Sequence, residues 1–155
     1  MNGPESAQSL LVTRMLLAKG ADVHVRDSNG QTVLMRAVNQ SPELIRLLIQ
    51  KGADVNQSDK MGNTPLSFAF KLEMQRTLIE NGADVNRPDR SGMTPLMRAA
   101  SMGMPRELID LLLKHGANVN YRDPKGQTAL MLAQRMKNHT TVAALKQAGA
   151  QEPVE

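Results

Sequence analysis

The sequence predicts an all-α solenoid, built from helix–turn–helix–loop repeats of about 33 residues. A Gly-Ala-Asp-Val string, with Asn in place of Asp in its fourth copy and cut to Gly-Ala in its last, begins at Gly20, Gly52, Gly82, Gly116 and Gly149. Between these copies an Asp-x-x-Gly-x-Thr string recurs, starting at Asp27, Asp59, Asp89 and Asp123. Two linked strings at a regular period indicate stacked repeats and a binding surface, rather than a globular domain around a buried active site.

The first expected element is one helix over residues 10–19, because too few residues precede it for a complete helix pair. We divide the single domain, 1–155, into an N-terminal half-repeat or cap, three repeats, a C-terminal capping repeat and a tail. These segments are 6–26, then 27–58, 59–88 and 89–122, then 123–150 and 151–155. The last expected helix, 140–148, is more polar, as the outer face of a terminal repeat needs to be.

The third repeat shows the expected elements of one unit. Thr94 is a good N-cap, and Pro95 suits the first helical position, where no backbone N–H is needed. Gly103 and Pro105 should end this helix. A second helix, 107–114, carries an apolar stripe, and Gly116 after it is expected to have positive φ, as are Gly52 and Gly82. A long loop then leads to the next repeat.

These strings resemble the ankyrin repeat family, whose signature is T-P-L-H-x-A. The matching strings begin at Thr32, Thr64, Thr94 and Thr128, and the resemblance covers about residues 10–150. The chain departs from the signature at the histidine position, which holds Met35, Ser67, Met97 and Met131. We therefore expect the histidine's hydrogen bond to the cap threonine to be lost in every repeat, and methionine to fill the gap. The second repeat is short, which predicts an abrupt turn at 71–73.

The composition excludes several kinds of chemistry. The chain has 155 residues, a net charge of +4 and no cysteine, so disulfides, thiolate zinc sites and cysteine nucleophiles are excluded. No apolar run is long enough to predict a membrane span. The polar N-terminus lacks a signal peptide, so we expect a cytoplasmic protein, with the bacterial periplasm as the alternative if a leader has been removed.

No residue pattern points to catalysis, a cofactor or a metal. His24, His115 and His139 do not have metal-ligand spacing to one another or to a carboxylate cluster. The repeated aspartates suit turns, in which their side chains accept hydrogen bonds from loop N–H groups. The repeated glycines are not followed by the Gly-Lys-Ser/Thr of a phosphate loop. We predict that the chain is not an enzyme.

The resemblance places the binding surface on a concave groove formed by the loop tips and the exposed sides of the first helices. The tips are mainly basic or apolar, and aromatic, Met and Arg side chains are typical of interface cores. The predicted partner-binding residues are Arg26, Asn29, Arg36, Lys60, Met61, Phe68, Lys71, Leu72, Arg90, Arg98, Met102, Tyr121, Lys125 and Met136.

Two classes of function follow from this surface. The first is a protein-binding module, either an adaptor or an inhibitor that covers an enzyme's active site. The resemblance extends to small stand-alone ankyrin proteins, including bacterial self-protection inhibitors. The second is a regulatory binder of nucleic acid that uses the basic tips. The shortage of extra acidic residues at the tips favours a protein partner with an acidic or carboxylate-lined surface. We expect the free chain to be a monomer.

Overall fold

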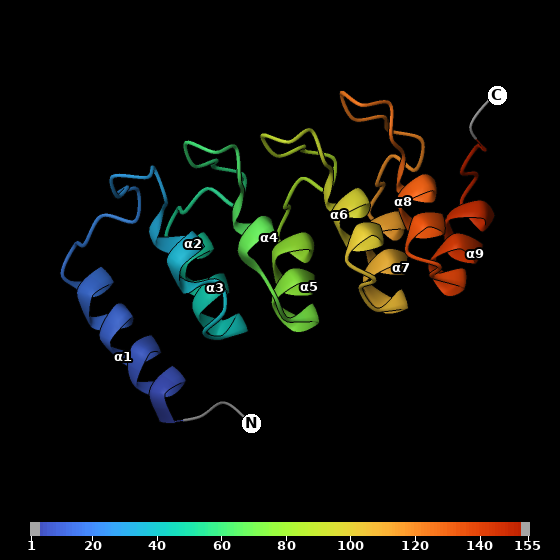
Figure 1. Cartoon of the computed structure of the whole chain (residues 1–155). Helices are drawn as coiled ribbons and strands as arrows, with labels where there is room; N and C mark the ends of the chain where they lie inside the picture. The colour runs from blue at the N-terminus through green and yellow to red at the C-terminus, as the bar shows by residue number, and fades with distance from the viewer. Residues whose placement is uncertain (1–3, 153–155) are drawn as a thin grey trace. The chain divides into compact units, whose positions relative to one another are not determined.

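The computed structural model describes residues 4–152, and its regular elements there are helices, with one isolated β-bridge between Arg26 and Thr32 (Figure 1). The chain divides into two compact units, Met1–Ala83 and Asp84–Glu155. None of the described helices is both long and apolar enough to cross a membrane.

The first unit holds five helices within its described residues. They are α1 (Pro4–Ala18), α2 (Val33–Ala37), α3 (Pro42–Gln50), α4 (Pro65–Phe68) and α5 (Leu72–Glu80). Helix α2 packs on α3 and α4 packs on α5, while α3 lies between α1 and α5. The loops that follow α1 and α3 project from the same side of these helices (Figure 1).

The second unit repeats the arrangement with two helix pairs over the described part of its chain. They are α6 (Pro95–Ser101) with α7 (Arg106–Lys114), and α8 (Ala129–Arg135) with α9 (His139–Gln147). The first helices, α6 and α8, pack on each other, and so do the second helices, α7 and α9. The loops before α6 and α8 again lie on one side (Figure 1).

Polar side chains start the helices, as predicted from the repeated threonines. The Oγ1 atoms of Thr32, Thr94 and Thr128 each accept a hydrogen bond from the backbone N–H three residues later, at 3.3 Å in each case. Ser41 caps α3 in the same way, through the N–H of Leu44 at 3.2 Å. Such caps stabilise a helix by about 1 kcal/mol each, because they satisfy N–H groups that lack a partner within the helix.

Glycine ends the second helices. Gly52, Gly82 and Gly116 have φ values of 98°, 90° and 83°, which confirms the predicted positive φ. The N–H of the residue after each glycine reaches back to the last turn, for example from Ala53 to the carbonyl of Leu48 at 2.9 Å. This is the hydrogen-bonded termination that a left-handed residue permits.

The core of each unit is aliphatic and rich in methionine, as the scarcity of aromatic residues predicts. The largest fully buried side chains of the first unit are Leu34, Leu44, Ile45, Leu48, Met74 and Leu78. Those of the second unit are Leu96, Met97, Ile109, Leu112, Leu130 and Leu132. Burial of a side chain of this size stabilises the folded chain by about 1.5–3 kcal/mol.

The N-terminal helix is longer than predicted. Helix α1 begins at Pro4 rather than at residue 10 and has 15 residues. Proline suits the first turn of a helix, where its missing N–H costs nothing, so the helix can extend back to it. The prediction came from the repeat register, which says nothing about residues before the first full repeat.

The short second repeat is the main departure from a regular repeat. Helix α4 has only four residues, and Ala69 after it is extended, with φ −80° and ψ 115°. Lys71 is the N-cap of α5, and Leu72 is the first residue of that helix. Lys71 and Leu72 were predicted to bind the partner from the exposed side of the first helix, and that placement is wrong, because the deletion shortens this helix as well as the turn.

The residues that replace the family's histidine also differ from expectation. The backbone N–H of Thr32 donates to Met35 Sδ at 3.4 Å, and that of Thr64 donates to Ser67 Oγ at 3.3 Å. In the first two repeats a side chain at the histidine position therefore still bonds to the cap threonine. The prediction that this bond is lost in every repeat was wrong, because a sulfur or hydroxyl acceptor can serve the threonine N–H.

Candidate functional site

Each loop tip is a turn organised by its aspartate. Asp27 Oδ1 accepts hydrogen bonds from the backbone N–H groups of Asn29 and Gln31, at 2.8 and 3.0 Å. The aspartates of the other three tips, Asp59, Asp89 and Asp123, accept from the same two relative positions. This confirms the predicted turn role and shows how the aspartates hold the tips in shape.

Two tips add an ion pair to the first helix that follows. The guanidinium of Arg36 lies 2.5 Å from Asp27 Oδ2, and Arg98 pairs with Asp89 in the same way. The pKa of Asp27 is lowered, first by the hydrogen bond from Arg36 and then by that from the Gln31 N–H. The other two tips lack this pair, because Phe68 and Leu132 occupy the equivalent helix positions.

Arg26 joins two loops of the first unit. Its Nε donates to the carbonyl of Gly30 at 2.9 Å, and its guanidinium also donates to the carbonyl of Ser58. Arg26 therefore fixes the positions of successive loops, which is a structural use of a residue predicted to bind the partner.

The predicted cations thus fall into two groups. Arg26, Arg36 and Arg98 are engaged by acceptors of the chain itself. Lys60, Lys71, Arg90 and Lys125 are exposed, and the ion pairs found among residues 4–152 include none of the three lysines. The lysines can reach a partner's acidic groups without first breaking an ion pair, which makes them the better candidates.

The predicted apolar candidates are also divided. Met61, Met102 and Met136 have exposed fractions of 52%, 61% and 50%, and Asn29 at a tip is exposed too. Phe68, Leu72 and Tyr121 are only half-exposed.

The most exposed aromatic residue is Phe70, at 74%, which is not among the predicted partner-binding residues. The short second repeat was the signal in the sequence for this exposure, because its first helix ends at Phe68 and leaves Phe70 outside the helix.

Phe70 stands on a backbone that three hydrogen bonds fix. Asn39 Nδ2 donates to the carbonyl of Phe68 at 2.6 Å, and the Phe70 N–H donates to Asn39 Oδ1 at 3.0 Å. From the other side, Gln75 Nε2 donates to the carbonyl of Ala69 at 3.0 Å. An exposed aromatic on a fixed backbone loses little conformational entropy when it enters a partner's pocket.

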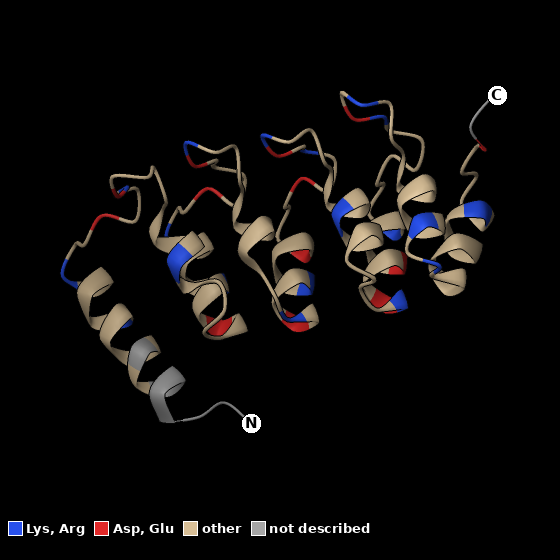
Figure 2. Cartoon of the chain, viewed as in Figure 1, with Lys and Arg blue, Asp and Glu red and all other residues tan. Residues whose placement is uncertain are grey.

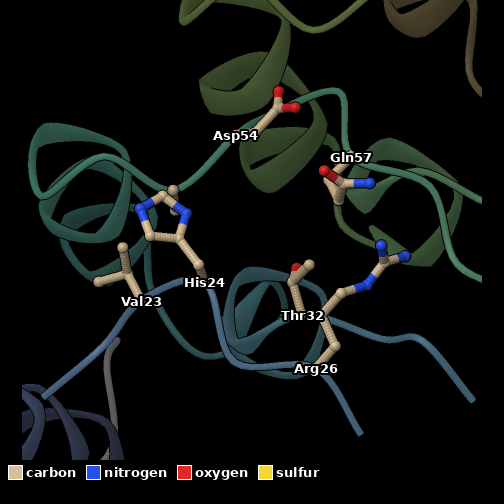
Figure 3. A pocket seen from close by; sticks show the side chains of 7 residues that line it. Val23, His24, Arg26, Thr32, Asp54 and Gln57 are labelled. Carbon is tan, nitrogen blue, oxygen red and sulfur yellow. The ribbon is translucent and has the colours of Figure 1, made fainter. Parts of the chain in front are cut away.

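A small pocket lies between the first two loops of the first unit (Figure 3). It is lined by Val23, His24, Arg26, Thr32, Ala53, Asp54 and Gln57. Its volume of about 40 Å³ holds no more than a few water molecules, far less than the several hundred Å³ of a typical ligand site. Because Arg26 is already held by backbone carbonyls, the pocket belongs to the framework of the loops.

Acidic and basic residues are interspersed along the loops of each unit (Figure 2). Besides the tip aspartates, Asp22, Asp54 and Asp84 are exposed near the bases of the loops, where each accepts a backbone hydrogen bond two residues on. Over residues 4–152 no group of three or more His, Cys, Asp or Glu side chains is arranged to hold a metal ion.

A family model described as "Ankyrin repeats (3 copies)" matches residues 5–89 and 70–154. No curated protein matches the chain. The two matched segments overlap and span nearly the whole sequence, and the fold within them has the threonine caps, terminal glycines and aspartate turns described above. The all-α solenoid fold class is therefore confirmed, and the chain belongs to the ankyrin repeat family.

Proposed function

We propose that this chain is a non-catalytic module that binds a partner protein through its loop tips and the exposed sides and C-terminal ends of its first helices. Ankyrin repeats are in general protein–protein interaction modules. The observation that supports this surface is the exposure of large apolar side chains there, namely Met61, Met102, Met136 and Phe70. Aromatic and Met side chains are enriched in protein–protein interfaces.

The partner we propose has an acidic or carboxylate-lined surface. Lys60 precedes Met61, and Lys71 follows Phe70, so each of these two exposed apolar residues has an exposed lysine next to it in the sequence. Lys125 adds a further exposed cation at a tip of the second unit. Complementary charge of this kind raises the association rate and excludes partners with basic surfaces. At the low micromolar concentrations used for binding, we expect the free chain to be monomeric.

We further propose that the partner is an enzyme whose active site the chain covers. An apolar side chain with a lysine beside it fits a cleft that has an apolar floor and carboxylates at its edge. An adaptor role, in which the partner stays active when bound, is the alternative. Cytoplasmic localisation remains a prediction.

The test starts with capture of partners from the source cells by the tagged chain, followed by mass spectrometry and reconstitution from purified proteins. The combined change Met61→Ala and Phe70→Ala should weaken binding by roughly 100-fold or more, since anchor residues contribute about 2 kcal/mol or more. Lys114→Glu, at an exposed position of α7, is the control and should change affinity little. The double change is preferable to one that removes Arg98, whose loss would also leave Asp89 without its ion pair.

Two readouts separate the candidate functions. Inhibition of the reconstituted partner's activity at saturation supports an inhibitor, and unchanged activity supports an adaptor. Binding to DNA or RNA of any sequence, with a steep dependence on salt, would replace the protein-binding proposal by the nucleic-acid alternative.

A further inference from the structure

Helix α1 carries a large apolar surface that no other described part of the chain covers. Leu11, Val12, Met15 and Leu16 have exposed fractions of 59%, 50%, 56% and 55%. At 3.6 residues per turn these four side chains form two adjacent i, i+4 rows, and therefore one continuous stripe along the helix. The opposite face, with Leu10, Thr13 and Leu17, is half-buried, and α1 packs against α3.

The C-terminal helix shows what a terminal helix of the same chain looks like when its outer face meets water. On α9 the exposed residues include Thr140, Lys146 and Gln147. Lys146 also pairs with Glu152 at 2.6 Å. A polar outer face is what a terminal repeat needs for solubility. The stripe on α1 has the opposite character and resembles a surface that another helix covers.

We propose that the α1 stripe is a self-association surface, on which the α1 helix of a second copy of this chain packs in antiparallel orientation. The four stripe residues are uncharged, so two identical stripes meet without burying a charge. A two-fold interface uses the same patch on both copies, which a uniform apolar stripe satisfies without any complementary partner.

The ends of the stripe determine the orientation. Gln8 precedes it and Lys19 follows it, and both are exposed. In a parallel pair the two Lys19 side chains would face each other and repel. In an antiparallel pair Lys19 of one copy lies beside Gln8 of the other. The two lysines are then roughly 16 Å apart, beyond the screening length of about 8 Å at physiological ionic strength.

The size of the stripe predicts a weak dimer. Four side chains exposed over about half of their area offer on the order of 350 Å² per copy, or about 700 Å² for the pair, below the ~1,200 Å² of the smallest stable interfaces. We therefore expect a dissociation constant on the order of 100 µM. At low micromolar concentration, well below this dissociation constant, the chain is then mainly monomeric.

Sedimentation equilibrium of the full chain, from about 10 µM to 1 mM, tests the proposal. The unmodified chain should pass from monomer to dimer over this range. Met15→Glu should raise the dissociation constant by about tenfold or more, because each dimer would have to remove two carboxylates from water. Met102→Glu is the matched control, since Met102 has a similar exposed fraction of 61%. It should leave the dissociation constant unchanged.

A cross-linking experiment tests the orientation on an otherwise native stripe. The chain has no cysteine, so Gln8→Cys and Lys19→Cys chains, one of them tagged, each carry a single thiol. Mild oxidation of the mixture should give mainly the mixed disulfide. A chain that stays monomeric to 1 mM, equal effects of Met15→Glu and Met102→Glu, or a predominance of Lys19→Cys homodimers would each overturn the proposal.

Discussion

At the scale of single residues, two glycines with nearly the same φ angle have different neighbours. Gly82 and Gly92 have φ values of 90° and 82°. A Cβ added at Gly82 would meet nothing within 4 Å, whereas one added at Gly92 would collide with the ring of Pro124. At Gly82 only the positive φ favours glycine. At Gly92 the ring of Pro124 also leaves no room for a side chain.

This difference gives a prediction about stability. Gly82→Ala should cost about 1–2 kcal/mol, the strain of a left-handed residue with a side chain. Gly92→Ala should cost at least about 1 kcal/mol more, because the loop that holds Pro124 must move. Urea denaturation followed by circular dichroism measures both changes. Equal losses of unfolding free energy would contradict the packing of these two loops.

A second prediction concerns the ion pair at the first loop tip. The carboxyl of Asp27 has a pKa below its ordinary value of 3.8, chiefly because Arg36 donates a hydrogen bond to it. In Arg36→Gln this pKa should rise toward 3.8, but not reach it, because the N–H groups of Gln31 and Asn29 still donate. Carboxyl ¹³C NMR titration measures the pKa directly.

The sign of the effect on stability follows from the lowered pKa. Because the folded pKa lies below the unfolded one, the carboxylate stabilises the fold at pH values above 3.8, and this contribution disappears as the pH falls through the folded pKa. Arg36→Gln should therefore lower stability near neutral pH and have little effect below the folded pKa. Arg46→Gln, at an exposed position of α3, should leave the pKa of Asp27 unchanged.

At the scale of elements, the short second repeat depends on one side chain from the first. Asn39 donates to the carbonyl of Phe68 and accepts from the N–H of Phe70, so it replaces the backbone bonds that α4 loses by ending early. Gln75 holds the same turn from the other side, because its Nε2 donates to the carbonyl of Ala69. The buried Oε1 atom of Gln75 has no hydrogen-bond partner among the described residues, so this turn contains an unsatisfied polar atom.

We predict that Asn39→Ala destabilises the chain by about 1–3 kcal/mol, because the partly buried carbonyl of Phe68 and the exposed N–H of Phe70 lose their partner. The matched control is Asn29→Ala at an exposed loop tip, which should cost no more than about 0.5 kcal/mol. Urea denaturation compares the two, and hydrogen exchange of the Phe70 amide should accelerate only in Asn39→Ala. Unchanged exchange would show that Asn39 does not hold this turn.

The elements also show how far sequence reasoning reaches. Helices α6 and α7 begin and end within one residue of the predicted positions, because threonine, proline and glycine act on their own backbone. Helix α4 did not follow its repeat, because a deletion in the turn can be absorbed either by the turn or by the helix before it. In this chain the helix is shortened, and the hydrogen bonds of Asn39 to Phe68 and Phe70 hold the backbone that follows it.

At the scale of the molecule, successive repeats are linked by a row of side-chain amides within each unit. Asn56 Nδ2 donates to the carbonyl of Gly82 at 2.9 Å, and Asn120 Nδ2 donates to that of Gly149 at 3.1 Å. Asn120 Oδ1 also accepts from the N–H of Gln151 at 2.9 Å. At the first position of this row the chain has His24, whose side chain lies near Gly52.

This row predicts opposite effects for a pair of substitutions. His24→Asn should stabilise the chain by about 0.5–1.5 kcal/mol, because the amide can make the bonds that its counterparts make. Asn120→His should destabilise it by a similar amount or more, since the carbonyl of Gly149 and the N–H of Gln151 lose their partner. Thermal and urea denaturation measure both. Stabilisation by both substitutions would contradict a common role for this position.

The sequence by itself determined the repeat, the helix pairs, the aspartate turns and the glycines after the second helices, because each depends on residues only a few positions apart. The tertiary structure decided which of the candidate binding residues are available. Arg26, Arg36 and Arg98 are held by acceptors 4 to 32 residues away, and Phe70 rather than Phe68 is the exposed aromatic. Exposure and pairing depend on which segments fold against each other, and a repeat pattern does not specify that for individual side chains.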